Sequence, residues 1–230
     1  MIQRFMMLVS KLRQELFKTD LQGGGERVDI LYSRHVDFEK MDMYQKSHYR
    51  RYEFAQGFVR THDVCGDLAC GTGYGTVMLS KVASKVIGVD INHEVITAIK
   101  RRYKRMNNIE FVCASLIDLD YQEFFNKIVS FETVEHFHEE DICMLFEVFN
   151  RALVADGQLI FSTPYMQPKS PQATKMGFHQ TFEIDEKTVQ SWLSRAGFLT
   201  EIIKYQNYET HTIADHLEIR DFMICVARKR

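Results

Sequence analysis

The glycine-rich segment Asp67-Leu-Ala-Cys-Gly-Thr-Gly73 is the part of this chain best suited to binding a ligand. An apolar run that starts at Val64 leads into it, and a later apolar run, Val86-Ile-Gly-Val-Asp90, ends on an acid. Glycine has no Cβ, so Gly71 and Gly73 allow a tight turn and the close approach of a ligand. A carboxylate at the end of the second run can accept hydrogen bonds from ribose hydroxyls. The spacing therefore predicts a nucleotide-type cofactor site at the carboxyl ends of two parallel strands.

The turn departs from both common phosphate-binding patterns. The third glycine of the dinucleotide fingerprint would fall at Thr76, but the glycine stands at Gly75 instead. No lysine follows the turn, which excludes a P-loop. Asp67, just before the turn, would repel a pyrophosphate and attract a cation. A ribose-bearing ligand with a positive centre and no phosphate is S-adenosylmethionine, and this is the cofactor that we predict.

Four motifs in this order resemble those of the class I S-adenosylmethionine-dependent methyltransferases. Asp67 to Gly73 matches the first motif and Val86 to Asp90 the acidic second strand. Phe131-Glu-Thr-Val-Glu-His136 matches the fourth-strand motif, and Leu153 to Pro164 the late loop-and-strand motif. A plain turn between a strand and a helix is the alternative for the glycine segment taken alone. The resemblance covers roughly residues 44 to 204 and implies methyl transfer on a doubly wound sheet. The cofactor contacts that we expect are Tyr52, Asp67, Ala69, Gly71, Gly73, Asp90, Ile91, Ser115, Leu116 and Phe131.

Acidic and imidazole side chains follow the predicted fourth strand. Glu132, Glu135 and His136 lie close together in the sequence, and His179 lies in a later loop that must return over the same strand ends. Two Glu and two His form a donor set suited to Mg²⁺ or Mn²⁺. A divalent ion lowers the pKa of a hydroxyl ligand, and a neutral imidazole can take its proton. We therefore predict catalytic roles for Glu132, His136 and His179, and metal binding by all four residues.

Two alternatives to the metal site stay open. In the first, the site holds no metal and His136 or His179 is the base. In the second, Glu132 and Glu135 cap the following helix or lie in solvent, and His136 is a packed histidine. An aromatic helix upstream is expected to close over the site through Tyr44, His48 and Tyr52, with ordinary helix packing as its alternative.

Three methyltransferase families share parts of this constellation. Small-RNA 3′-end 2′-O-methyltransferases hold a metal with a Glu-x-x-Glu-His segment and a distant His, and ubiquinone-pathway O-methyltransferases carry a similar segment. A group found with glycan-assembly enzymes resembles this chain most, through His48 to Ala55, the glycine turn and Gly177-Phe178-His179. The chain departs from that group's Asn-Pro-Phe-His pattern before Phe178, and Glu183 stands one position too late for a role to carry over.

The resemblance implies O-methylation of a sugar hydroxyl on a glycan or glycan precursor. The alternatives are a small catechol-like or quinone-like acceptor, an RNA 3′ end, and a non-catalytic cofactor-binding protein that docks on a glycosyltransferase through its N-terminal helix. A formal net charge of −2 disfavours nucleic acid, because phosphate binding needs clustered Lys and Arg. The basic run Lys100 to Arg105 ends a predicted helix, where cations favour the helix dipole, with a polyanion patch as the alternative.

The 230 residues suit one α/β domain, residues 44–230, preceded by a helix, linker and cover segment, residues 1–43. The N-terminal helix is expected over 3–18, before a flexible glycine joint at 23–25, and Arg4 and Lys11 exclude a membrane span or signal sequence there. The five Cys show no Cys-x-x-Cys pairing, and Cys65, Cys70 and Cys113 lie in or beside predicted buried strands. This predicts thiols that act as small core residues in a reducing compartment, the cytoplasm.

Apolar periodicity predicts strands that alternate with helices, and the family resemblance implies seven strands with the last antiparallel. Asp185 is expected to cap the last helix, with Gly197 just past its end. All three Pro lie between residues 164 and 171, which predicts an irregular loop. The helices are expected over 44–60, 75–82, 93–104, 139–152 and 185–195, and the strands over 64–68, 85–90, 109–113, 127–131, 157–163, 198–205 and 219–227.

Overall fold

The computed structural model of the protein describes residues 27–30, 37–170 and 179–230. The expected helix over 3–18 and the glycine joint lie outside these ranges. The described helices are η1 Phe38–Lys40, α2 Met43–Gln56, α3 Tyr74–Leu79, α4 His93–Arg102, η2 Leu116–Asp118, η3 Val134–His136, α5 Glu139–Ala152 and α7 Glu186–Arg195. The described strands are β1 Val64–Leu68, β2 Lys85–Asp90, β3 Ile109–Cys113, β4 Phe125–Phe131, β5 Leu153–Pro164, β6 Phe198–Gln206, β7 Ile213–Ala214 and β8 Phe222–Lys229.

These strands form one sheet in the order β3-β2-β1-β4-β5-β8-β6-β7. Neighbouring strands from β3 through β5 run parallel. β8 lies between β5 and β6 and is antiparallel to both. The predicted doubly wound, mostly parallel sheet with an antiparallel closing strand is therefore confirmed. The difference is β7, a two-residue strand paired with the end of β6, which is too short for its alternation to show in the sequence.

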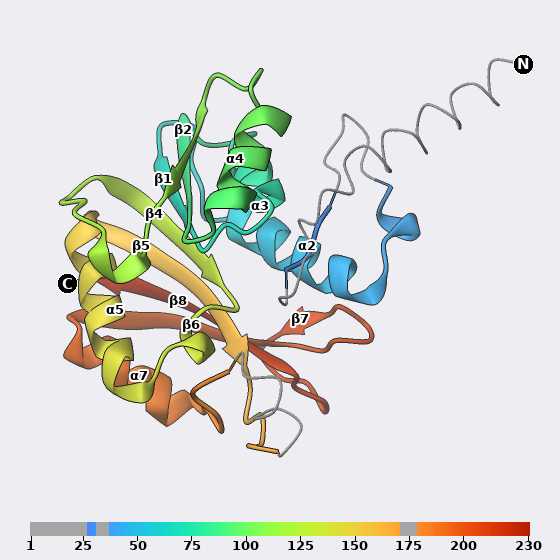
Figure 1. Cartoon of the computed structure of the whole chain (residues 1–230). Coiled ribbons are helices and arrows are strands. Elements are labelled where there is room, and N and C mark those ends of the chain that lie inside the picture. Colours follow the sequence, from blue (N-terminus) through green and yellow to red (C-terminus); the bar gives the residue numbers. More distant parts are fainter. Residues whose placement is uncertain (1–26, 31–36, 171–178) are drawn as a thin grey trace, which may run out of the picture.

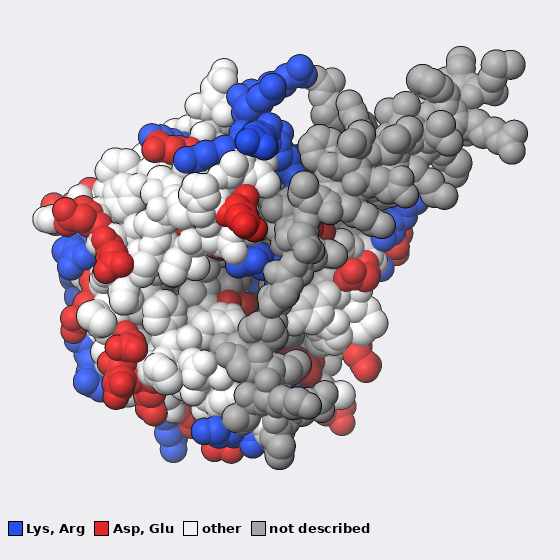
Figure 2. Space-filling view, viewed as in Figure 1, with Lys and Arg blue, Asp and Glu red and all other residues white. Residues whose placement is uncertain are grey.

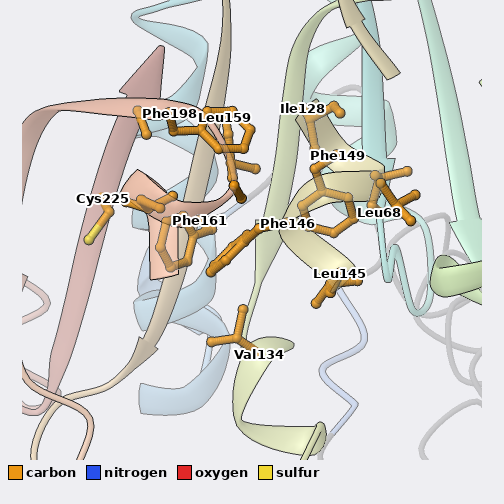
Figure 3. Packing of buried hydrophobic residues seen from close by; sticks show 14 of the residues in the cluster. Leu68, Ile128, Val134, Leu145, Phe146, Phe149, Leu159, Phe161, Phe198 and Cys225 are labelled. Atoms are coloured by element: carbon orange, nitrogen blue, oxygen red, sulfur yellow. The ribbon is translucent and has the colours of Figure 1, made fainter. Parts of the chain in front are cut away.

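Helices cover both faces of the sheet (Figure 1). α5 and α7 pack on one face, and α2, α3 and α4 pack on the other. Successive side chains of a strand point to opposite faces, so Leu159 and Phe161 of β5 join the α5 side while Ile160 joins the α2 side. Figure 3 shows Phe161 beside Phe146 of α5 in the larger core. This packing fixes the carboxyl ends of β1, β2 and β4 at one edge of the molecule.

Several element ends differ from the sequence expectation. α2 stops before Gly57, whose N–H turns back to a carbonyl of the last helical turn. β5 starts earlier than expected, because Leu153 already pairs with Phe125 ahead of a register shift. The expected ends of α7 are confirmed: the Asp185 side chain accepts a hydrogen bond from the first turn, and Gly197 has a φ of +81°.

Lys and Arg side chains gather at the end of α4 (Figure 2). Lys100, Arg101 and Arg102 stand in its last turn, where positive charge favours the helix dipole. Arg102 has a further partner, because its guanidinium bonds both carboxylate oxygens of Asp29. Part of the basic run therefore holds an upstream segment in place.

The cysteines are all free thiols. Cys65, Cys70 and Cys225 are buried, and burial raises the pKa of Cys65 to about 12. Cys113 is exposed, contrary to the expectation for its strand, because β3 is the edge of the sheet. Within the described ranges, no helix has the length and apolar character that a membrane crossing requires.

Candidate active site

The glycine segment forms the expected turn between β1 and α3. Gly71 and Gly73 have φ angles of +50° and +74°, in the region that favours glycine. A Cβ added at Gly71 would meet no atom within 4 Å, so this position faces open space. The Gly71 N–H donates to Asp90 Oδ2 at 3.0 Å, and the Asn92 N–H donates to Oδ1 at 2.9 Å. The turn and the acid of β2 are thus one unit, and the carboxylate keeps lone pairs for ligand hydroxyls.

Asp67 stabilises the turn through buried hydrogen bonds. It is fully buried and accepts hydrogen bonds from Tyr52 Oη at 2.9 Å and Thr76 Oγ1 at 2.6 Å. Burial raises the pKa of Asp67 to about 6, although both hydrogen bonds favour the charged form. A Cβ at Gly75 would lie 2.0 Å from Cζ of the Tyr52 ring. The glycine that breaks the dinucleotide pattern therefore makes room for the tyrosine that Asp67 holds.

A cavity of about 670 Å³ opens beside this turn, a size typical of small-molecule sites. Asp67, Gly71 and Gly73 are not among its lining residues, since they form or brace the turn. Ile91 is 71% exposed, whereas Leu116 is nearly buried, and both present apolar surface to the cavity. The expected cofactor contacts that line the cavity are Tyr52, Ala69, Asp90, Ile91, Ser115, Leu116 and Phe131.

Residues 27–30 are one of two described stretches of the expected cover segment, and they close one wall of the cavity. Their first two residues, Arg27 and Val28, line it. Thr72 Oγ1, within the glycine turn, donates to the Val28 carbonyl at 2.9 Å. The Arg102 guanidinium bonds Asp29 at 2.6 and 3.0 Å. This stretch of the expected 1–43 segment is therefore part of the site.

A buried arginine of α2 binds the carboxylate of Glu132, the residue that follows β4. Arg51 is fully buried, with Nη1 3.0 Å from Glu132 Oε1 and Nε donating to Gln206 Oε1 at 2.7 Å. Ser162 Oγ donates to the same Glu132 oxygen at 2.7 Å. The guanidinium carbon lies 4.0 Å from the centre of the Phe222 ring. Glu132 has a φ of +51°, a strained conformation that these contacts maintain.

Glu135, His136 and His179 come together, with one potential ligand atom of each within 4.8 Å of the others. His136 lines the cavity, and Glu135 is buried. Glu132 lies outside this group, since its carboxylate is engaged by Arg51 and Ser162. The structure therefore unites three of the four predicted metal ligands.

The loop that carries His179 is attached to the fourth-strand motif. The N–H groups of Gln180 and Thr181 donate to the Glu135 carbonyl at 2.7 and 3.1 Å. His179 Nδ1 lies 2.8 Å from Gln167 Oε1, and its ring meets the His136 ring at 5.2 Å between centres. These bonds bring the later loop back over the strand ends, as its place in the sequence predicted.

Helix α2 contributes a further imidazole, that of His48, to the cavity. His48 and Tyr52 line it, while the Tyr44 ring stacks on His48 with centres 5.6 Å apart. The loss of solvent around the ring, and then the charge of Arg51, lower the pKa of His48 well below its ordinary value. His48 is thus neutral at pH 7, and the same two causes disfavour its protonated form.

Comparison with known proteins agrees with this geometry. Residues 66–157 match the family described as a methyltransferase domain. A probable S-adenosylmethionine-dependent methyltransferase of Mycobacterium tuberculosis is 29% identical over 135 residues, which are 58% of this chain and 47% of that protein. These matches indicate a methyltransferase that uses S-adenosylmethionine. The chain spans about half the length of the curated relatives that it matches.

Solved structures share the fold of this chain. A S-adenosylmethionine-dependent methyltransferase of Mesorhizobium loti superposes with a TM-score of 0.66 at 19% identity, covering 84% of this chain and 100% of that one. The N-methyltransferase NodS of Bradyrhizobium japonicum, in complex with S-adenosyl-L-homocysteine, gives 0.63 at 15% identity over 84% of this chain and 90% of that one. Such low identities establish the fold alone.

Sequence reasoning missed two charged residues at or next to the cavity, Arg27 and Arg51. Helix periodicity carries a signal for the second, because Ser47, Arg51 and Ala55 repeat every four residues on the buried face of α2. An arginine on such a face needs a buried partner. The sequence carries no comparable signal for Arg27, which stands in an irregular segment.

Proposed function

We propose that this protein transfers a methyl group from S-adenosylmethionine to a sugar hydroxyl of a glycan or glycan precursor. The observation that carries the proposal is the division of one cavity into two chemically different ends. β2 and the residues after β3 supply Asp90, Ser115 and Leu116 on one side of β1, whereas β4 leads to Glu132 and His136 on the other.

The first end suits the nucleoside. The Asp90 carboxylate, held by backbone N–H groups, accepts hydrogen bonds from the ribose hydroxyls. Ile91 and Leu116 offer apolar contacts for the two faces of adenine, with Ser115 at its edge. The methionine part then lies over the glycine turn, where Gly71 leaves open space, and the methyl group points toward β4.

The second end suits a hydroxyl acceptor. A sugar hydroxyl is a weak nucleophile, so a neutral imidazole that takes its proton accelerates attack on the methyl carbon. His136 stands at this end and takes this proton when no metal is bound, and Glu132 is held there as a hydrogen-bond acceptor for a second hydroxyl. Methyl transfer is a single in-line displacement, so the remaining contribution is to align the acceptor oxygen with the methyl carbon and the sulfonium.

We further propose that Glu135, His136 and His179 hold Mg²⁺ or Mn²⁺. One carboxylate and two imidazoles, with ligand atoms within 4.8 Å of one another, form a donor set that such an ion accepts. Glu132 is not part of this proposal, because Arg51 already neutralises it. When bound, the ion would lower the pKa of an acceptor hydroxyl that it coordinates.

A small phenol or quinol is the second candidate acceptor. Phe131 and Phe137 line the same end of the cavity and would stack on an aromatic ring.

We propose a cytoplasmic location, which the free thiols support. The division into residues 1–43 and 44–230, and docking of the N-terminal helix on a glycosyltransferase, likewise stay proposals.

Cofactor binding is tested first by thermal unfolding with S-adenosylmethionine. At a ligand concentration about 100 times Kd, the stabilisation should be about 2.7 kcal/mol. That corresponds to a rise in Tm of about 5 to 11 °C for a chain of this size. No rise at saturating cofactor would reject the cofactor assignment.

Acceptor class is tested by transfer from labelled S-adenosylmethionine to sugars, catechols and short RNAs. Label in the sugars supports the proposal, and label in another class replaces it. The His136→Ala variant should lose most activity, whereas His138→Ala, an exposed neighbour, should keep it. Activity that persists in full with a chelator would exclude an essential ion.

A further inference from the structure

The cavity has a positive charge that the proposed reaction leaves unused. Among its described lining residues, Arg27 alone carries a permanent positive charge. No acidic side chain of the described ranges forms an ion pair with it. His48 supplies no such charge, because its pKa is lowered well below the ordinary value.

S-adenosylmethionine carries one anionic group, the carboxylate of its methionine part. The rest of the cavity does not attract an anion, because the Asp90 carboxylate lines it and the charges of Arg51 and Glu132 cancel each other. With the nucleoside over β2 and β3, the methionine part lies over the glycine turn. Arg27 stands at this turn, because Thr72 holds the carbonyl of the next residue, Val28.

We propose that Arg27 binds the carboxylate of S-adenosylmethionine, and that residues 27–30 form a strap that holds it over the glycine turn. A guanidinium matches a carboxylate with two parallel hydrogen bonds, which gives both affinity and a fixed orientation of the methionine part. The inference rests on the proposed function, since it names a further cofactor contact of the same site.

The strap is anchored independently of any ligand. Val28 and Ile30 are buried in the core on the α2 side. Asp29 pairs with Arg102 of α4, and its carbonyl accepts a hydrogen bond from Gln45 Nε2 at 2.7 Å. Contacts to α2, α4 and the glycine turn therefore fix the backbone that carries Arg27, so its side chain reaches the cavity at little entropic cost.

The test compares two nucleosides that differ in the amino-acid part. S-adenosylhomocysteine has the carboxylate, whereas 5′-methylthioadenosine lacks it. Calorimetric Kd values for both are measured with the wild type, Arg27→Gln, Arg27→Lys and the exposed control Arg105→Gln. We expect Arg27→Gln to weaken S-adenosylhomocysteine about tenfold or more and to leave 5′-methylthioadenosine within about twofold, as loss of one charged hydrogen bond predicts. Arg27→Lys should recover part of the loss, and Arg105→Gln should change neither Kd.

The outcomes separate this inference from the proposed function. Equal weakening of both nucleosides by Arg27→Gln would mean that the arginine only supports the cavity wall, and would overturn the inference. Unchanged binding of S-adenosylhomocysteine would overturn it as well, with the cofactor site intact. If the wild type bound neither nucleoside, the proposed function would fail and the inference with it. An Asp29→Asn variant should reduce the preference for S-adenosylhomocysteine, because it weakens the anchor of the strap.

Discussion

Removal of the Glu132 side chain should destabilise the whole domain, beyond any effect on catalysis. Glu132 neutralises Arg51, a guanidinium that is fully buried beneath α2, while Glu132 itself is 15% exposed toward the cavity. In Glu132→Ala the charge of Arg51 stays buried with only neutral partners, chiefly Gln206 and the Phe222 ring. Removing one partner of a buried pair costs about 3 to 5 kcal/mol. Because water from the cavity can enter the vacated space, the lower end of this range is expected.

For a chain of this size, a loss of about 3 kcal/mol lowers Tm by roughly 6 to 12 °C. The assay is urea unfolding followed by circular dichroism, with Glu147→Ala as the control, an exposed glutamate on α5. The control should stay within about 0.5 kcal/mol of the wild type. Arg51→Met completes the set and should cost less than Glu132→Ala, since the remaining carboxylate still reaches the cavity.

The double variant Arg51→Met/Glu132→Ala distinguishes charge pairing from simple loss of contacts. It removes both charges, so its destabilisation should be smaller than the sum of the single changes by about 1 to 3 kcal/mol. Additive losses, or a loss below about 1 kcal/mol for Glu132→Ala, would refute the view that this pair holds α2 on the sheet.

Three further changes test the glycine turn and the buried carboxylate of Asp67 that stabilises it. Gly75→Ala should cost about 3 kcal/mol or more in urea unfolding, because its Cβ would lie 2.0 Å from the Tyr52 ring; a loss below about 1 kcal/mol would contradict this packing. Gly71→Ala should cost only about 1 kcal/mol in stability, because its φ is +50°. It should nevertheless weaken cofactor binding, since the added Cβ would occupy the open space next to the glycine turn; an unchanged cofactor Kd would count against the binding pose. Asp67 has a pKa of about 6 in the folded protein against an ordinary 3.8, so the folded state binds more protons between these values and stability falls as pH rises through them. Ionisation of buried Asp67 should lower the free energy of unfolding by a total on the order of 3 kcal/mol above pH 6. Asp67→Asn should remove this pH dependence from urea unfolding measured between pH 4 and 7, and an identical pH dependence in the variant would show that other groups cause it.

The frame of this fold could be predicted from local sequence signals. Short apolar runs gave β1, β2 and β3 their observed bounds. β1 and β2 are buried on both faces and so carry mostly apolar residues, whereas the edge strand β3 carries both buried and exposed residues. The Asp185 cap and the glycine turn were likewise local, since each depends on a few consecutive residues. The short β7 strand and the early start of β5 were not, because both depend on pairing with distant strands.

What the sequence by itself determined is the cofactor end of the site: the turn around Gly71, the acid Asp90 and the residue types around them. The tertiary structure decided which partners the charged side chains after β4 bind. The sequence predicts Glu132 as a metal ligand beside Glu135, but in the structure its carboxylate forms an ion pair with Arg51. Arg51 is oriented in turn by a hydrogen bond to Gln206, 155 residues further along the chain. The physical reason is that a buried charge is satisfied by whichever partner folding brings within reach, and spacing along the chain does not record that distance.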